Sequence, residues 1–379
     1  MSVVIFSPTE KIWGGSQIFI ESLCRFLDAR NTTSTIATSE PLSFQCPTVE
    51  LGPVGRKRDR LLESIRLAFR LSRVSTKVVV LNDLSALWLA PIFKLRGFKV
   101  VALLHLRAQR KNALGFGHRP LELMVLKFGA RFADVSLSVN SDNLSAFTTP
   151  VKFVGNFVPD WFFEPKTRIR KVYDLGFIGR FAPEKNLIAF LHLIKNLSSV
   201  SGKPVRAVMA GDGPSAGSIR STIIEMGLSE QIDLIGWQDR EDLPMLYDSI
   251  RCFAIMSHHE GFPTTLLEAH ARGVPAIASD TAGYASEFLA DEGPVTGLRF
   301  RWADTNQQAF LRKVARLIKR HADYYEDCVS KARTYSEKRV LGMIASEIDQ
   351  LTRDNCDRKK RVNASRGELG QPDKSHGTL

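Results

Sequence analysis

The stretch Glu260-Gly-Phe-Pro-Thr-Thr-Leu-Leu-Glu268 lies between two runs that are typical of buried strands, Arg251–Ser257 and Val274–Ser279. Pro263 suits the first turn of a helix, because its fixed φ is helical and no amide hydrogen is needed there. The order strand, helix, strand predicts a parallel α/β sheet, in which ligands bind beyond the carboxyl ends of the strands. We therefore expect the first glutamate in the loop and the second within the helix, both facing one crevice.

The start of this helix also suits phosphate. Amides at a helix N-terminus have no partner within the helix and attract anions. One acid that binds hydroxyls, together with amides that bind a diphosphate, would suit a nucleotide-sugar. The alternative is an ordinary βα unit with two solvated acids. The predicted binding residues on this unit are Glu260, Gly261, Glu268 and the three residues whose amides we expect to be free, Thr264, Thr265 and Leu266.

The spacing of the two glutamates, with Gly-Phe-Pro between them and Ala269 after them, resembles the retaining GT-B glycosyltransferases of family 4, the glycosyl transferases group 1. The resemblance is strong over residues 174–290 and weaker over the N-terminal half. It implies two Rossmann-like domains that face a cleft, and transfer of a sugar with retention from a nucleotide diphosphate to an acceptor hydroxyl. In the family, the counterpart of Glu268 binds the ribose, and Glu260 would hold the donor sugar.

Length and composition agree with a two-domain globular protein. The 379 residues are enough for two cores, and 44% are hydrophobic and 24% charged. No apolar run reaches the roughly 18 residues that a membrane helix needs, and the N-terminus has no basic leader, so we expect neither a membrane span nor a signal peptide. Dispersed cysteines predict reduced thiols and a cytoplasmic location; they are Cys24, Cys46, Cys252, Cys328 and Cys356.

The net charge of +12 is concentrated in one part of the chain. Residues 56–131 contain seventeen Lys and Arg against four acids, a net of +13. A basic surface attracts nucleic acid, anionic lipid or anionic substrates. No zinc-finger, RRM or aromatic-interleaved basic pattern is present, so we do not expect nucleic acid as a partner.

Two clusters in this basic segment suggest contact with an anionic membrane. Leu61, Ile65 and Phe69 recur every four residues and predict an amphipathic helix with a basic flank. A core-packed helix with solvated arginines is the alternative. The clusters are Arg56, Lys57, Arg58, Arg60, Arg66, Arg70 and Arg73, and then Arg107, Arg110 and Lys111. A lipid-linked acceptor at the inner face of a membrane would use such a surface.

The N-terminal half contains two further candidate site features. Gly14 and Gly15 follow the strand Val3–Ser7 and precede a helix from Ser16, where they would let backbone approach a ligand; a flexible turn is the alternative. The family carries such a pair here.

His105 follows the strand Phe98–Leu104, so its side chain would point into the crevice. A structural histidine is the alternative, but the resemblance implies a sugar-contacting histidine at this strand end. We expect further strands over Lys77–Leu81 and Ala133–Val139, with helices over Leu84–Leu95 and from Ser141 to Ala146.

In the second half, Arg180 and Lys185 follow the strand Asp174–Ile178. Two cations at the mouth of a helix suit a diphosphate, although a surface pair of basic residues would look the same. The segment matches the Gly-Arg…Glu-Lys-Asn pattern of the family, which implies that both cations hold the donor diphosphate.

Two more positions complete the candidate site. Gly211 follows the strand Val205–Ala210 and would let a base or phosphate approach, or would form only a tight turn. Trp237 follows Ile232–Ile235, where the family contacts the nucleobase, but a packed aromatic residue is equally compatible. The glycine pattern near Gly211 is not the dinucleotide fingerprint, because position 216 is Ala.

We expect a first, acceptor-side domain over residues 1–162 and a nucleotide-sugar domain over 170–335. The C-terminal helices are predicted at about Gln307–Tyr324 and Ser336–Leu351. The resemblance implies that a helix over 336–353 crosses back to the first domain. The polar residues 354–379 predict a disordered tail.

The sequence therefore predicts a glycosyltransferase of surface polysaccharide or glycolipid assembly, with a nucleotide-sugar donor, a glycan or lipid-linked acceptor, and no metal or other cofactor. Arg180, Lys185, Glu260 and His105 are the predicted catalytic residues. A GT-B-like epimerase or phosphorylase remains an alternative, and a dinucleotide-dependent oxidoreductase is a more distant one.

Overall fold

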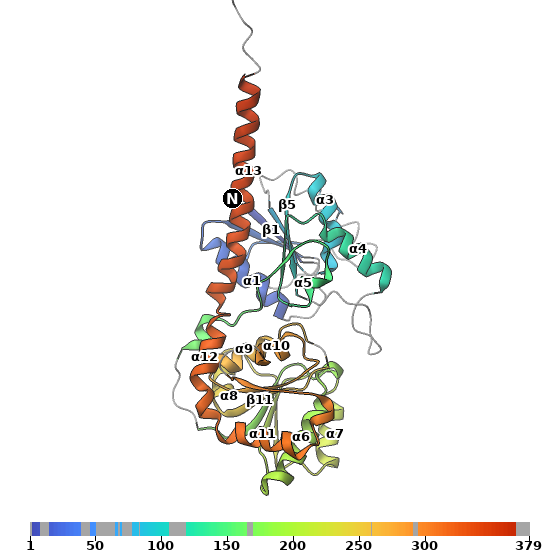
Figure 1. Ribbon diagram of the computed structural model, residues 1–379, viewed down its shortest axis with the longest axis vertical. Helices are drawn as coiled ribbons and strands as arrows, with labels where there is room; N and C mark the ends of the chain where they lie inside the picture. Colours follow the sequence, from blue (N-terminus) through green and yellow to red (C-terminus); the bar gives the residue numbers. More distant parts are fainter. Residues whose placement is uncertain are drawn as a thin grey trace, which may run out of the picture.

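The chain forms two parallel α/β domains stacked along the long axis of the molecule, as the computed structural model shows (Figure 1). The structure describes residues 2–7, 15–38, 46–50, 65–66, 69, 78–82, 84–105, 119–164, 170–258, 260–290 and 295–368. Both sheets consist of parallel strands, and helices cover them. The predicted fold class, two Rossmann-like domains, is confirmed.

The first domain is built on a seven-stranded sheet of order β3-β2-β1-β4-β5-β6-β7. The order reverses between β1 and β4, and an open sheet forms its ligand crevice at such a reversal. The strands are β1 (Ser2–Ser7), β2 (Thr33–Thr38), β3 (Thr48–Glu50), β4 (Val78–Asn82), β5 (Lys99–Leu104), β6 (Val135–Ser138) and β7 (Val151–Phe153). The helices are α1 (Gly15–Asp28), the 3-10 helix η1 (Leu84–Leu89), α3 (Ala90–Leu95), α4 (Pro120–Ala130) and α5 (Asn143–Ala146).

The second domain has a six-stranded sheet of order β10-β9-β8-β11-β12-β13, with its reversal between β8 and β11. The strands are β8 (Tyr173–Ile178), β9 (Ala207–Ala210), β10 (Ile232–Gly236), β11 (Ile250–Ile255), β12 (Ala276–Ser279) and β13 (Gly297–Phe300). The helices are η2 (Asp160–Phe163), η3 (Pro183–Lys185), α6 (Leu187–Ser201), α7 (Ala216–Glu225), α8 (Leu243–Asp248), α9 (Thr264–Ala271), α10 (Tyr284–Ala290), η4 (Trp302–Asp304), α11 (Gln308–Lys319), η5 (His321–Tyr324) and α12 (Tyr325–Arg333).

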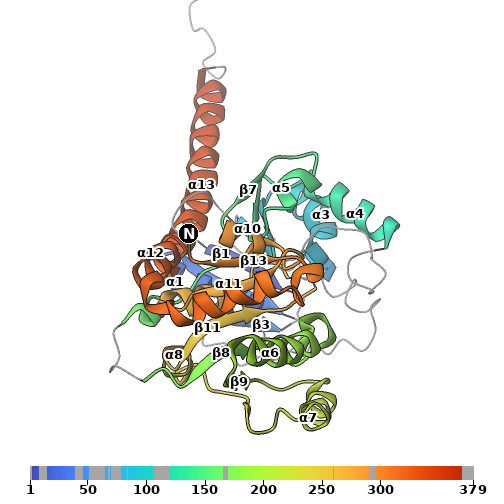
Figure 2. The same cartoon turned by 60° about the horizontal axis from the view of Figure 1, so that its bottom comes forward.

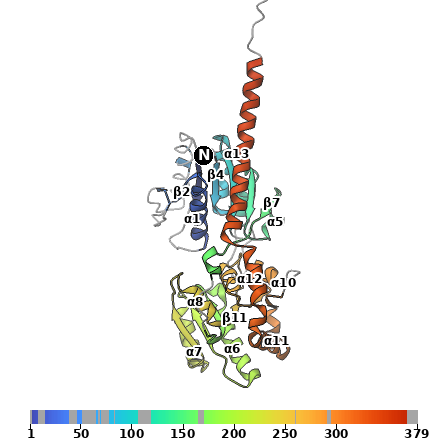
Figure 3. The same cartoon turned by 90° about the vertical axis from the view of Figure 1, so that its left-hand side faces the viewer.

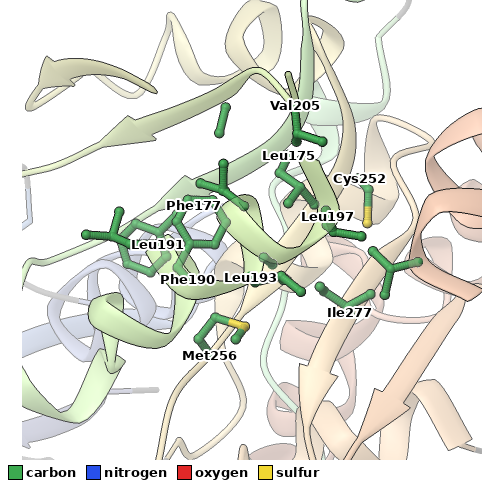
Figure 4. Close-up of a cluster of buried hydrophobic side chains, with 14 of the residues drawn as sticks. Leu175, Phe177, Phe190, Leu191, Leu193, Leu197, Val205, Cys252, Met256 and Ile277 are labelled. Atoms are coloured by element: carbon green, nitrogen blue, oxygen red, sulfur yellow. The ribbon is translucent and has the colours of Figure 1, made fainter. Parts of the chain in front are cut away.

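Each domain has its own hydrophobic core. In the second domain, α6 and α11 cover one face of the sheet (Figure 2) and pack residues such as Phe190, Leu197 and Val314 against Leu175 and Ile277 of the strands. Figure 4 shows the labelled side chains of this core gathered around α6 and β8. Strands that are covered on both faces are almost continuously apolar, which is why the sequence identified most of them.

The last helix, α13 (Glu337–Glu368), returns from the second domain to the first (Figure 3). Its buried side chains join the core of the first sheet, and Lys152 and Arg30 form ion pairs with Glu347 and Asp349 on it. The side chains that it adds to this core are Val340, Leu341, Ile344, Ala345, Ile348 and Leu351.

Several element boundaries differ from the sequence prediction. The residues 84–95 form a 3-10 helix and then α3, because Pro91 lies at the start of α3 and cannot donate a helical hydrogen bond. The disorder predicted from residue 354 is wrong as far as Glu368, since α13 continues to that residue. Helical hydrogen bonds are local, so a charged helix extends without a core to cover it. The predicted helix Gln307–Tyr324 is likewise α11 followed by η5.

Between the two domains, the loop after β11 is held by close backbone packing. A Cβ atom on Gly261 would lie 3.0 Å from the carbonyl oxygen of His105 in the first domain. A Cβ atom on Gly283 would lie 2.3 Å from the carbonyl oxygen of Glu260. The side-chain amide of Asn156, in the connection between the domains, donates to the carbonyl oxygen of Phe262 at 3.1 Å. Glycine at position 283, in the loop after β12, is therefore required by this packing, whereas Gly261 makes only a tight contact.

We predict that Gly283→Ala destabilises the protein by about 1–3 kcal/mol more than Gly227→Ala. Both glycines have a positive φ, +58° and +68°, so both substitutions carry a similar backbone cost. Only Gly283 has a carbonyl oxygen in the way, because nothing lies within 4 Å of a Cβ atom on Gly227. Denaturant unfolding of the two variants measures the difference, and equal losses of stability would contradict the packing described.

Candidate functional site

The loops that follow β8 and β11 meet at the reversal of the second sheet. The Nζ atom of Lys185 lies 2.5 Å from Oε1 of Glu260. The hydroxyl of Ser257 donates to the same carboxylate oxygen at 2.6 Å. Both charged side chains are mostly buried, at 21% and 13% exposed. The structure thus brings together two of the predicted catalytic residues, from positions far apart in the chain.

Side chains behind this pair hold the loop after β11. The hydroxyl of Ser279 donates to the carbonyl oxygen of Ser257 at 2.6 Å, and that of Thr281 donates to the same oxygen at 3.3 Å. The amide of His258 donates to the carbonyl oxygen of Glu184 at 2.9 Å and so joins the two loops. The sequence did not single out Ser257 or Ser279, because a serine at the end of a strand has no distinguishing pattern.

Arg180 lies on the more open side of the site. Its guanidinium is 2.6 Å from Glu184, four residues on, and the Arg180 side chain is 49% exposed. Exposed ion pairs of this kind contribute at most about 1 kcal/mol. The guanidinium of Arg180 is thus more accessible to solvent than the ammonium group of Lys185.

The start of α9 presents two amides rather than three. Pro263 is the residue before the helix, and α9 begins at Thr264. The prediction that the Leu266 amide is free is wrong, since it donates to the carbonyl oxygen of Pro263 at 3.2 Å. This is a 3-10 type hydrogen bond, from an amide to the carbonyl oxygen three residues earlier, which is common at helix ends. Within the described part of the chain, the amides of Thr264 and Thr265 have no acceptor.

Glu268 lies within α9 and is 6% exposed. The hydroxyl of Tyr247, on α8, donates to its Oε2 atom at 2.8 Å. Burial raises the pKa of the Glu268 carboxyl, while the Tyr247 bond and the charge of Arg240 act in the opposite direction. Tyr247 is completely buried and holds one oxygen of the carboxylate from behind. The sequence did not identify it, because its pattern is that of any core aromatic residue.

Gly211 permits a close backbone approach. It has a φ of +136°, and a Cβ atom there would lie 1.9 Å from the carbonyl oxygen of Gly179. Its amide donates to the carbonyl oxygen of Gly236 at 2.7 Å, so the loop after β9 is joined to the last residue of β10. Trp237 comes directly after Gly236, and its side chain is 69% exposed, so it is not an aromatic residue of the core.

The first domain contributes a polar network at the carboxyl ends of its strands. The Nε2 atom of His105 lies 2.9 Å from Oδ1 of Asn82, and the side-chain amide of Asn82 donates to Ser7 Oγ at 3.0 Å. His105 is 8% exposed and contacts the ring of Phe19 edge-on at 4.9 Å. It is thus held in the crevice by neighbours from β4 and α1. Asn82 was missed as a site residue, because its partner is distant in sequence.

Gly15 is the first residue of α1, and a Cβ atom there would meet nothing within 4 Å. Gly14 lies outside the described residues.

A hydrogen bond also joins the two domains. The hydroxyl of Ser141, in the first domain, donates to Oε2 of Glu287, in the second, at 2.6 Å.

Most of the predicted basic surface lies outside the described residues, namely the positions 56–60, 61–62, 70, 73, 107 and 110–111. Of the predicted amphipathic helix, Ile65 packs against the core of the first domain. Phe69 is half exposed, and the guanidinium of Arg96 lies over its ring at 4.6 Å.

The described part of the chain has no group of three or more His, Cys, Asp and Glu side chains that could hold a metal ion. Among its helices, none combines the length and the apolar character needed to cross a membrane. The four cysteines with described side chains are free and buried.

Residues 160–335 match the family described as glycosyl transferases group 1. A 2-deoxystreptamine N-acetyl-D-glucosaminyltransferase of Niallia circulans is 30% identical over 140 residues, which are 35% of this chain and 36% of the relative. A UDP-Gal:alpha-D-GlcNAc-diphosphoundecaprenol alpha-1,3-galactosyltransferase of Escherichia coli is 29% identical over 116 residues, 30% of each chain. This chain therefore aligns with only about a third of the length of these relatives.

The match to solved structures extends over both domains. The Anabaena protein Alr3699/HepE, solved in complex with UDP, superposes with a TM-score of 0.75 at 16% identity, covering 92% of this chain and 100% of that one. At this identity the likeness establishes the fold. The chain has the two-domain GT-B fold, and its residues 160–335 match the glycosyl transferases group 1.

Proposed function

We propose that the protein is a retaining glycosyltransferase that moves a hexosyl group from a nucleotide-diphosphate sugar to an acceptor hydroxyl without a metal ion. The observation that carries the proposal is the Lys185–Glu260 pair beside the two unpartnered amides of Thr264 and Thr265. Cationic and acidic groups with free helical amides in one crevice suit a diphosphate attached to a polyol. The match of residues 160–335 to a transferase family supports the same conclusion.

Charge balance in the site favours exchange of partners when the donor binds. Among the described residues, Lys185 forms an ion pair with Glu260 alone. A donor diphosphate would replace this carboxylate as the counter-ion of Lys185. Glu260, still held by Ser257, would then accept hydrogen bonds from the hydroxyls of the donor sugar. Arg180 would complete the stabilisation of the leaving diphosphate.

The remaining contacts distribute over the nucleotide and the sugar. Glu268 would accept hydrogen bonds from the ribose with the carboxylate that Tyr247 holds in place. Trp237, which is exposed, would stack on the base, and we propose that Gly211 lies near the base or the phosphates. His105 would contact the transferred sugar from the first domain, and Gly14 and Gly15 remain proposed donor-binding residues.

The acceptor we propose is a glycan or a lipid-linked glycan used in surface polysaccharide or glycolipid assembly. The E. coli relative named above is a transferase that acts on a diphosphoundecaprenol-linked sugar. The excess of +13 in residues 56–131 would favour such an anionic acceptor and an anionic membrane. We accordingly propose a cytoplasmic protein that works at the inner face of the membrane.

Nucleoside diphosphate binding tests the donor class directly. A bound nucleotide stabilises the folded protein by about 2.7 kcal/mol at a hundredfold excess over Kd, so it raises Tm. We expect UDP, GDP or ADP, but not all three equally, to raise Tm in a thermal denaturation screen, with CMP as a comparison. Absence of any shift at millimolar nucleotide would contradict the proposal.

The two cations should matter for turnover. We expect Arg180→Ala and Lys185→Ala each to reduce turnover about 10²-fold or more, because each removes a fixed positive charge at the leaving diphosphate. Arg206→Ala is the matched control, since Arg206 lies in a comparable exposed ion pair with Asp233, away from the loops of the site. Normal turnover by both site variants would show that the diphosphate lies elsewhere.

The two glutamates should have separable roles. Glu268→Ala should weaken the binding of free nucleoside diphosphate, because it removes the ribose acceptor. Glu260→Ala should spare that binding, or strengthen it by releasing Lys185, and should reduce transfer instead. Isothermal titration with the nucleotide, together with transfer rates, separates the two outcomes. An equal loss of nucleotide affinity in both variants would refute this division.

A further inference from the structure

Helix α4 has a second apolar face, directed away from the domain. Its inner face, formed by Leu123, Leu126 and Ala130, packs into the core with η1. Gly129 lies so close to η1 that a Cβ atom there would be 2.2 Å from the carbonyl oxygen of Leu87. This tight docking fixes which residues of α4 face outward.

The outward residues recur with the spacing of one helical face. Leu121, Met124, Val125 and Phe128 follow the pattern i, i+3, i+4, i+7. They are 68%, 61%, 44% and 55% exposed. A solvent-facing helix stripe is normally polar, and a continuous apolar stripe on the outside marks an interaction surface. Figures 1 and 2 show α4 at the outer edge of the first domain, on the side opposite α13.

Positive charge accompanies the apolar stripe. Lys127 and Arg131 follow one flank of it, and Arg119 immediately precedes the helix. The segment 119–131 contains one acid, Glu122, against these three cations. A shallow hollow of about 390 Å³ opens between α4 and Thr148. Its lining combines the apolar side chains of Leu123, Met124 and Phe128 with Lys127 and Arg131.

The position of α4 relates this face to the crevice. Helix α4 lies in the chain between β5 and its parallel neighbour β6. In such a unit the helix begins at the sheet edge where the preceding strand ends. Pro120 and Leu121 therefore lie towards the crevice edge of the first domain. A surface that contacts α4 would be close to the point where an acceptor enters.

We propose that the outward face of α4, formed by Leu121, Met124, Val125 and Phe128 with Lys127 and Arg131, docks on an anionic lipid bilayer. The apolar side chains enter the region between headgroups and acyl chains, and the cations pair with lipid phosphates. This inference deepens the proposed function, on which it rests for the nature of the acceptor. It places the first domain against the membrane with the crevice at its edge.

The test is co-sedimentation of the full chain with vesicles of phosphatidylcholine containing phosphatidylglycerol, across a salt series. The wild type should bind at low salt, bind less as salt increases, and not bind pure phosphatidylcholine. The triple variant L121S/M124S/F128S and the double variant K127E/R131E should each bind at least tenfold more weakly.

Matched controls separate the α4 face from general surface effects. I224S/M245S/V295S removes three exposed apolar side chains from the second domain. R316E/K319E makes the same change in net charge on α11. Both controls should bind vesicles like the wild type. Absence of wild-type binding at low salt, or equal losses in the α4 variants and their controls, would overturn the proposal.

Light scattering measures the molar mass in solution and so tests whether the α4 face binds a second copy of the chain. A wild-type dimer that L121S/M124S/F128S dissociates, with vesicle binding unchanged, would show that α4 is a self-association face and overturn the proposal. Nucleotide binding without vesicles keeps the two proposals apart, because the α4 variants should retain it. Failure of every nucleotide to bind, with the vesicle contrasts intact, would refute the proposed function alone.

Discussion

Close backbone packing around the loop after β11 is the constraint on which the rest of the site depends. The carbonyl oxygen of Glu260 occupies the space that a side chain at Gly283 would need, and that of His105 lies 3.0 Å from the position of a Cβ atom on Gly261. Since peptide units are rigid and the protein interior is dense, such contacts fix position far more strictly than flexible side chains do. The loop therefore holds Glu260 at the boundary between the two domains.

The electrostatics of the site follow from this position. Glu260 is mostly buried, and a carboxylate there needs a counter-charge and hydrogen-bond donors, which Lys185 and Ser257 provide. Arg180, in contrast, remains exposed in a weak ion pair with Glu184. The two cations therefore differ in exposure, since the Lys185 side chain is 21% and the Arg180 side chain 49% exposed. Glu268 is also buried, and the hydroxyl of Tyr247 donates a hydrogen bond to one of its carboxylate oxygens.

The two domains are specialised in different ways. The second sheet carries almost all of the predicted donor-binding residues, and the match to a transferase family covers this part of the chain. The first sheet contributes the His105–Asn82 network and a helix, α4, with an apolar face on its outer side. Helix α13 adds six buried residues to the core of the first domain and so couples the two domains.

The sequence alone predicted the parallel α/β fold, and its motifs, taken with the family resemblance, selected Glu260, Glu268, Arg180 and Lys185 as candidate site residues. Strand and helix periodicity, and the placement of proline and glycine, are local properties that can be recognised without neighbours. Only the tertiary structure decided which of these residues meet. Lys185 and Glu260 are 75 positions apart, and Tyr247 reaches Glu268 from another helix. The structure also showed that the Leu266 amide has a hydrogen-bond partner and that one apolar face of α4 is exposed. Hydrogen-bond partners and burial depend on packing between elements, which a local sequence pattern does not encode.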